Sequence, residues 1–171
     1  MEKVNVRPQL SFTQAVKSTW QNMTNFRGRA RRSELWWSFL VYVAASCVGS
    51  WLFSGNIMLT LAFSVALYVW ITAVTVRRLQ DNGHSALWVF ASILSGLASS
   101  VIMSASGDLD LITAINATPD DVMKVVTAPV YLVLGAISTI SNLMILIFCL
   151  QDSDPRPNKY GDSPKYGVEM Q

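Results

Sequence analysis

The chain has 171 residues, of which 51% are apolar and only 14% are charged, against roughly 25% charged residues in a typical soluble domain. Three stretches, at 35–76, 82–107 and 125–151, contain no Asp, Glu, Lys or Arg. Helices of a soluble protein need a polar face, so these stretches exclude a soluble globular enzyme, a disordered chain and a disulfide-stapled secreted module.

Residues 10–26 form the first predicted element, an amphipathic helix. Ser11 and Gln14 have the spacing of a capping box. Apolar side chains then recur at intervals of three or four residues, at Phe12, Val16, Trp20 and Met23. Such a helix lies either in the lipid headgroup region or against the cytoplasmic ends of other helices, and the sequence leaves both placements open.

Four membrane-spanning helices are predicted next. A helical crossing needs roughly 20 apolar residues, so the stretch 35–76 is long enough for two crossings, with Ser54-Gly55-Asn56 as the turn. Thr118 followed by Pro119 predicts the start of a short surface helix before the last span. The four spans are expected at 35–53, 57–76, 86–104 and 127–150.

The distribution of basic residues predicts the orientation in the membrane. Four crossings return the chain to its starting side, and twelve of the thirteen Lys and Arg residues then share that side. Only Lys124 lies on the other side. Because Lys/Arg-rich loops stay in the cytoplasm, both termini are expected there, with the protein in the bacterial inner membrane.

The expected fold is therefore an all-α polytopic membrane protein: four transmembrane helices plus an N-terminal amphipathic cytoplasmic helix. We divide it into a cytoplasmic leader at 1–34, a four-helix transmembrane bundle at 35–150 and a cytoplasmic tail at 151–171. None of the four spans holds an Asp, Glu, Lys, Arg or His. Ion-coupled transporters and intramembrane hydrolases usually need one at depth, so neither activity is favoured.

Three motifs at the predicted cytoplasmic edge carry a family resemblance. The segment 26–37 reads FRGRARRSELWW, the connector 76–88 reads VRRLQDNGHSALW, and the tail 158–164 holds Asn-Lys-Tyr-Gly followed by Ser-Pro. In this order the motifs resemble the YhaH-like family of small bacterial inner-membrane proteins, catalogued as domain of unknown function 805. The resemblance implies a membrane location and no established activity. Gln80 departs from the family pattern, which often has His there, and Leu87 replaces the first of two Trp residues.

The candidate site is this arginine-rich edge. Glu34 and Asp81 are expected as charge partners, each able to take a bidentate guanidinium. The candidate ligands of an anion or a lipid headgroup are Arg27, Arg29, Arg32, Arg77 and Arg78. The expected interfacial anchors are Trp36, Trp37 and Trp88. The residues expected to close over the edge from the tail are Asn158, Tyr160 and Gly161.

Two interpretations of the edge remain open. The arginines either hold helix ends and loops together, or they bind the phosphate of a lipid or of another phosphorylated ligand. The first hypothesis for function is accordingly a non-enzymatic membrane protein that organises anionic lipid, or a protein partner, through this edge. The alternative is a small channel or transporter made by oligomerisation, and a lipid-modifying enzyme acting through Glu34, Asp81 or His84 is least favoured. No metal, cofactor or nucleic acid is expected.

Overall fold

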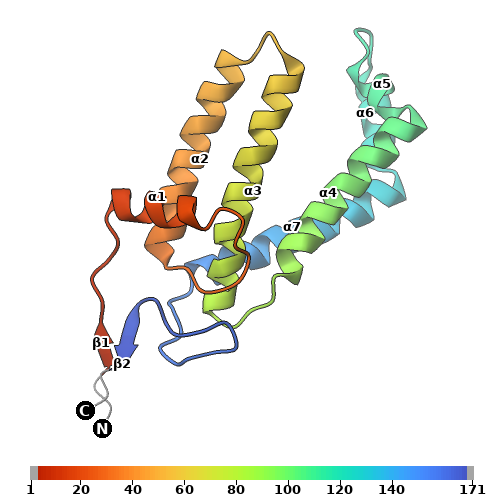
Figure 1. Ribbon diagram of the computed structural model, residues 1–171. Coiled ribbons are helices and arrows are strands. Elements are labelled where there is room, and N and C mark those ends of the chain that lie inside the picture. The colour runs from red at the N-terminus through yellow and green to blue at the C-terminus, as the bar shows by residue number, and fades with distance from the viewer. Residues whose placement is uncertain (1–3, 169–171) are drawn as a thin grey trace. The chain divides into compact units, whose positions relative to one another are not determined.

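The computed structural model describes residues 4–168, which are mainly helical (Figure 1). In chain order the elements are β1 (Val4–Val6), α1 (Phe12–Gln21), α2 (Arg32–Leu52), α3 (Ile57–Asp81), α4 (Leu87–Ser106), α5 (Asp108–Thr113), α6 (Pro119–Val126), α7 (Pro129–Leu150) and β2 (Tyr166–Val168). Four of the helices, α2, α3, α4 and α7, are long and apolar enough to cross a membrane. The predicted all-α polytopic fold is confirmed, and the chain is a multi-pass membrane protein.

Two spans include charged residues that the sequence prediction left outside them. Helix α2 begins at Arg32 rather than at residue 35, and α3 continues past residue 76 to Asp81. The prediction ended each span where charge began. In the structure, Arg77, Arg78 and Asp81 are buried in the last turns of α3 because they form ion pairs there.

The described chain divides into two compact units. The first holds residues 4–86 and 147–168, so it contains β1, α1, α2, α3, the end of α7 and β2. The second holds Leu87–Leu146, which covers α4, α5, α6 and most of α7. The candidate site lies in the first unit.

Helix α1 runs across α2 and α3 (Figure 1). Its buried residues are small: Ala15 and Thr19 are fully buried, and the hydroxyl oxygens of Thr19 and Ser38 lie 2.7 Å apart in a hydrogen bond. Its aromatic residues are exposed, Phe12 by 46% and Trp20 by 65%. The helix therefore packs on α2 through small residues, the Phe12 ring meets the Trp37 ring edge-on with centroids 5.4 Å apart, and Trp20 stays largely exposed. The predicted capping box of Ser11 and Gln14 is confirmed.

A close approach of α2 and α3 depends on one glycine. A Cβ atom added at Gly49 would lie 2.1 Å from Cε1 of Phe63, well inside van der Waals contact. The Phe63 ring also packs against Phe53, with ring centroids 5.4 Å apart. At the start of α3, the side chain of Asn56 accepts hydrogen bonds from the backbone N–H groups of Met58 and Leu59. The α2–α3 hairpin is thus shaped by a glycine contact and a helix cap.

The two ends of the described chain pair with each other. Strands β1 and β2 are antiparallel, with Val4 opposite Val168 and Val6 opposite Tyr166. The backbone N–H of Arg7 extends the pairing to the carbonyl oxygen of Lys165 at 2.9 Å. The sequence did not predict this sheet, because three-residue strands carry no readable periodicity. The leader and the tail consequently lie side by side.

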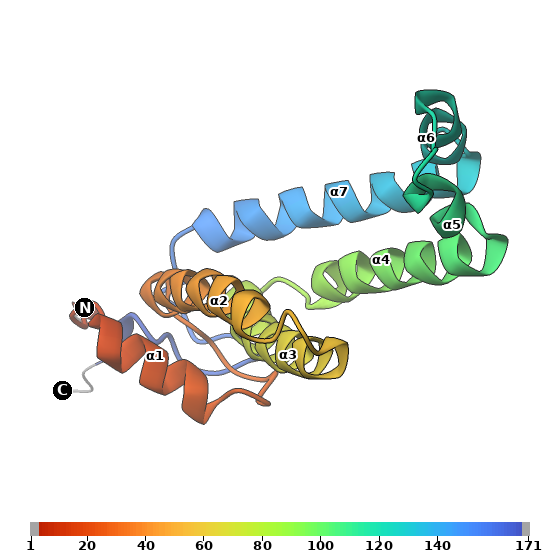
Figure 2. The same cartoon turned by 90° about the horizontal axis from the view of Figure 1, so that it is seen from above.

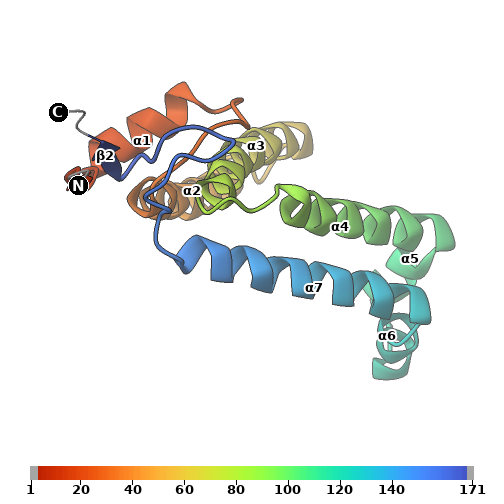
Figure 3. The ribbon, with the colours of Figure 1, turned by 90° about the horizontal axis from the view of Figure 1, so that it is seen from below.

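In the second unit, α4 and α7 run side by side (Figures 2 and 3). The Asn142 side-chain amide donates to the Ser92 hydroxyl at 2.9 Å, so a polar contact joins the two helices within their apolar length. The hydroxyl of Tyr131 donates to the Asp108 carboxylate at 2.7 Å. The predicted helix start at Thr118 and Pro119 is confirmed as the cap and first turn of α6.

Candidate functional site

Asp81 is the centre of a buried arginine–aspartate cluster, which we define as Arg29, Arg78 and Asp81. One carboxylate oxygen accepts a hydrogen bond from Nε of Arg29 at 2.8 Å, and the other accepts from Nη1 of Arg78. The three side chains are at most 1% exposed. Asp81 thus joins two guanidinium groups, one for each oxygen, instead of taking a single bidentate guanidinium as the sequence suggested.

Arg78 connects the end of α3 to two distant segments. Nη1 donates to the carbonyl oxygen of Ala30 and to the hydroxyl of Ser153, each at 3.3 Å. Nε donates to the carbonyl oxygen of Cys149 at 3.4 Å, and Nη2 donates to that of Gln151. All three guanidinium nitrogens of Arg78 therefore have acceptors within the chain, which join the residues before α2 and after α7 to α3.

Arg29 holds the tail over the cluster. Its guanidinium donates to the carbonyl oxygens of Asp154 at 2.5 Å, Arg156 at 2.8 Å and Gly161 at 3.2 Å. The predicted tail residues make their contacts here as well. The side-chain amide of Asn158 donates to the Gln80 carbonyl oxygen at 2.9 Å.

A tight turn shapes this part of the tail. The backbone N–H of Tyr160 donates to the side-chain oxygen of Asn158 at 2.8 Å. Asn158 and Gly161 form an isolated antiparallel bridge, and the φ of +120° at Gly161 lies in the region that favours glycine. The turn directs the carbonyl oxygen of Gly161 toward Arg29 and the amide of Asn158 toward α3.

A second buried ion pair joins α3 to α2. Nη1 of Arg77 lies 3.0 Å from a carboxylate oxygen of Glu34, and both side chains are 5% exposed. The Thr19 hydroxyl also donates to Glu34, at 3.4 Å, which links α1 to the pair. Among the residues that the structure describes, Nε and Nη2 of Arg77 have no hydrogen-bond partner, although both are buried.

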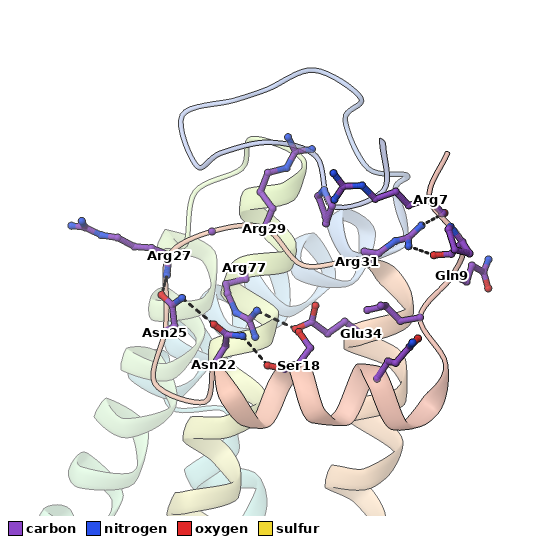
Figure 4. Close-up of a pocket in the computed structure, with 15 residues that line it drawn as sticks. Arg7, Gln9, Ser18, Asn22, Asn25, Arg27, Arg29, Arg31, Glu34 and Arg77 are labelled. Atoms are coloured by element: carbon purple, nitrogen blue, oxygen red, sulfur yellow. Dashed lines mark hydrogen bonds and ion pairs between the residues drawn. The ribbon is translucent and has the colours of Figure 1, made fainter. Parts of the chain in front are cut away.

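Arg77 and Glu34 line a cavity of about 620 Å³, which we call the Arg77 cavity (Figure 4). Its wall holds five arginines against one carboxylate. The charged lining residues are Arg7, Arg27, Arg29, Arg31, Arg77 and Glu34. In Figure 4 the Arg27 side chain extends away from the other labelled residues. The cavity therefore carries an excess of positive charge at the cytoplasmic edge predicted from the sequence.

A second pocket, the Arg32 pocket, lies where α2 begins. It has a volume of about 380 Å³, and its charged lining residues are Arg31, Arg32, Asp152 and Lys165. Asp152 pairs with Arg32 at 3.0 Å and with Lys165 at 2.5 Å. The hydrogen bond from Lys165 lowers the pKa of the Asp152 carboxyl, and the same bond raises the pKa of Lys165. Burial, followed by the nearby charge of Arg7, lowers the pKa of Arg31.

The Arg32 pocket shares two side chains with an apolar groove on α2. Trp36 and Trp37 line both of them. The groove has a volume of about 530 Å³ and continues along the helix past Phe39 and Leu40 to Val43. Both tryptophans are exposed, so the predicted anchors sit where a charged pocket meets an apolar helix face. The third predicted anchor, Trp88, belongs to the second unit.

Sequence reasoning missed several residues of these two pockets. Arg31 lay inside the recognised motif but was not singled out. Arg7 and Lys165 come together through the β1–β2 pairing, and no local pattern points to that contact. The isolated His84, considered earlier as an enzymatic group, stacks on Phe148 with ring centroids 3.6 Å apart.

Comparison with known proteins identifies the family to which the chain belongs. No curated protein and no solved structure matches it. The family model described as "Protein of unknown function (DUF805)" matches residues 23–162. The match begins just after the end of α1 and covers all four spans and the tail as far as the Asn158–Gly161 turn, so the chain is a member of the DUF805 family.

Proposed function

We propose that this protein is a non-enzymatic inner-membrane protein, with both termini in the cytoplasm, that organises anionic phospholipid at the Arg32 pocket. The observation that carries the proposal is the pair of tryptophans, Trp36 and Trp37, which line both a cationic pocket and an apolar groove. A phospholipid has the same two parts, a phosphate next to acyl chains.

The pairing of leader and tail supports the proposed topology. Strands β1 and β2 pair residues near both ends of the described chain, which is possible only if the two segments lie on the same side of the membrane, as an even number of crossings predicts. With four crossings, twelve of the thirteen Lys and Arg residues are on that side and Lys124 alone is on the other. This bias favours a cytoplasmic location for the termini.

The charge of the Arg32 pocket suits an anionic headgroup. The three cations Arg31, Arg32 and Lys165 face the single carboxylate of Asp152, so the pocket has two positive charges in excess for a lipid phosphate. Helix α2 also begins without a side-chain cap, and the first two residues of the helix, Arg32 and Ser33, line the pocket, so the positive end of the helix dipole lies beside it. The inner leaflet of a bacterial membrane is rich in anionic lipid, which attracts such groups.

The cluster arginines have a different role in this proposal from the one expected for them. Arg29 and Arg78 already donate to Asp81 and to backbone carbonyl groups. We therefore assign them to holding the tail in place, and the tail supplies Asp152 and Lys165 to the pocket. Arg32, which is 44% exposed, is the candidate for direct contact with the lipid phosphate.

The test compares two double variants that remove the same charge. The full chain is placed in nanodiscs of phosphatidylcholine mixed with phosphatidylglycerol, and the phosphatidylglycerol that it retains is measured by native mass spectrometry. Arg32→Gln with Lys165→Gln removes two cations from the pocket. Each Lys or Arg near the surface is worth about 1 kcal/mol toward anionic lipid, so binding should weaken roughly thirtyfold.

The control variant is Arg156→Gln with Lys159→Gln, which removes two cations from the same tail outside the pocket. It should retain phosphatidylglycerol as the wild type does. Equal loss in both double variants would mean that net charge alone attracts the lipid, and it would refute a specific site at the Arg32 pocket.

A further inference from the structure

The buried guanidinium of Arg77 has one edge without an acceptor. Nη1 is directed to Glu34 at 3.0 Å, whereas Nε and Nη2 have no partner among the described residues. In a guanidinium, the N–H of Nε and one N–H of Nη2 point the same way. They form a fork whose geometry matches two oxygens of a phosphate or a carboxylate.

Leaving this fork empty is unfavourable. A buried donor without an acceptor costs free energy, and the cost is larger for a charged group. The rest of the site holds the fork in a fixed orientation, since Glu34 occupies the far side of the guanidinium and is itself bound by the Thr19 hydroxyl. Thr19 in turn is hydrogen-bonded to Ser38 of α2. The fork is thus preorganised and lacks only an anion.

The surroundings of Arg77 favour phosphate as that anion. Of the five arginines in the cavity wall, Arg77 is paired with Glu34 and Arg29 with Asp81, and the Arg27 side chain extends away. Arg7 and Arg31 form no ion pair with the described carboxylates, and two such cations suit a dianion better than a monoanion. Side-chain amides of Asn22 and Asn25 also line the cavity, and they are ordered by hydrogen bonds to Ser18 and to each other. A volume of about 620 Å³ lies within the range of small-molecule sites, roughly 300–1,000 Å³.

We propose that the Arg77 cavity is a phosphate-binding site, with two phosphate oxygens accepting from Nε and Nη2 of Arg77. The ligand is a phosphate monoester or inorganic phosphate. Such a group comes either from a water-soluble metabolite or from a lipid whose headgroup is a terminal phosphate. The cavity shares Gln9 and Arg31 with the lining of the Arg32 pocket, but Arg77 does not line that pocket, and the proposal does not rest on the function assigned to it.

The experiment measures thermal unfolding of the full chain in nanodiscs. In the first arm the nanodiscs contain only phosphatidylcholine, and inorganic phosphate is compared with chloride at equal ionic strength. In the second arm no phosphate is added, and part of the phosphatidylcholine is replaced by phosphatidic acid. The variant is Arg77→Lys, which keeps a cation near Glu34 but removes the fork.

The matched control is Arg156→Lys, which makes the same exchange outside the cavity. The wild type and this control should be stabilised by phosphate in one arm, whereas Arg77→Lys should bind roughly tenfold more weakly or worse. If Arg77→Lys does not fold, the double variant Arg77→Gln with Glu34→Gln replaces the ion pair by two neutral side chains that can hydrogen-bond to each other, and it serves in its place.

Each result bears on the proposal. Stabilisation by inorganic phosphate that depends on Arg77 supports a soluble source, and stabilisation only by phosphatidic acid that depends on Arg77 supports a lipid source. No stabilisation in either arm, or stabilisation that persists in Arg77→Lys, overturns the proposal. Arg32→Gln with Lys165→Gln should leave the phosphate effect intact, so the two proposed sites can fail independently.

Discussion

The buried charge of Asp81 should contribute more to stability than any other carboxylate of the site. The substitution Asp81→Asn keeps the size of the side chain and removes its charge. Asp81 is fully buried between two guanidinium groups, so its neutralisation leaves the charges of Arg29 and Arg78 without a counterion. Removing one partner of a buried ion pair typically costs about 3–5 kcal/mol. We expect a loss of that size in the free energy of unfolding.

A matched control exists in the same unit. Asp152 also pairs with two cations, Arg32 and Lys165, but it is 49% exposed. Exposed pairs contribute about 0.2–1 kcal/mol each, so Asp152→Asn should cost far less than Asp81→Asn. The assay is denaturant unfolding of both variants and the wild type in the same detergent, followed by the fluorescence of the tryptophans near the site.

The tail provides a second readout for Asp81→Asn. Arg29 is oriented by Asp81 and holds the carbonyl oxygens of Asp154, Arg156 and Gly161. Loss of the carboxylate should therefore increase protease cleavage within residues 152–162 under conditions in which the spans stay folded. If Asp81→Asn and Asp152→Asn lower stability equally and neither exposes the tail, the cluster does not hold the tail and our reasoning about it is wrong.

Three further predictions concern packing, pH and topology. Gly49→Ala should cost about 1–3 kcal/mol by forcing the Phe63 ring away, and unchanged thermal stability would contradict the close contact of α2 and α3. The hydrogen bond from Lys165 lowers the pKa of the Asp152 carboxyl in the folded protein. The ionised carboxylate therefore contributes its full stabilisation at a pH above the pKa of Asp in the unfolded chain, and this stabilisation is lost as the pH falls through the lower pKa of the folded state. The stability difference between wild type and Asp152→Asn, at most about 2 kcal/mol for two exposed pairs, should thus shrink as the pH falls below the ordinary Asp pKa of about 3.9, whereas a difference that stays constant on acidification would refute the pairing. A reporter fused after Gln171 should stay cytoplasmic and one inserted near Asn116 should be exported, and the reverse pattern would overturn the topology.

Local signals in the sequence were sufficient for the helices and for two of their caps. The charge-free stretches determine the four spans, because a bilayer-spanning helix must satisfy its backbone internally and present apolar side chains. The caps at Ser11 and Thr118 are also local, since each depends on residues within one turn. The six-residue helix α5 was missed, because so short a segment carries too little periodicity to be recognised.

The ion-pair partners of the charged side chains could be identified only from the tertiary structure. The sequence identified the arginines and the two carboxylates of the edge, but Arg29 and Asp81 are 52 residues apart, and no local rule assigns Asp81 to Arg29 or Glu34 to Arg77. Whether the donors of a guanidinium already have acceptors within the chain decides whether it can bind a ligand. Arg78 is fully occupied within the chain, whereas its neighbour Arg77 keeps a free fork.

The sequence by itself therefore determined that the chain is a membrane protein and that its arginines lie near helix ends. Both properties follow from the composition of short segments, which can be read without knowing the fold. Only the tertiary structure decided which guanidinium groups are satisfied and which are not. That depends on the direction of each side chain and on acceptors brought in by distant segments, such as the tail that β1 and β2 fasten beside the leader.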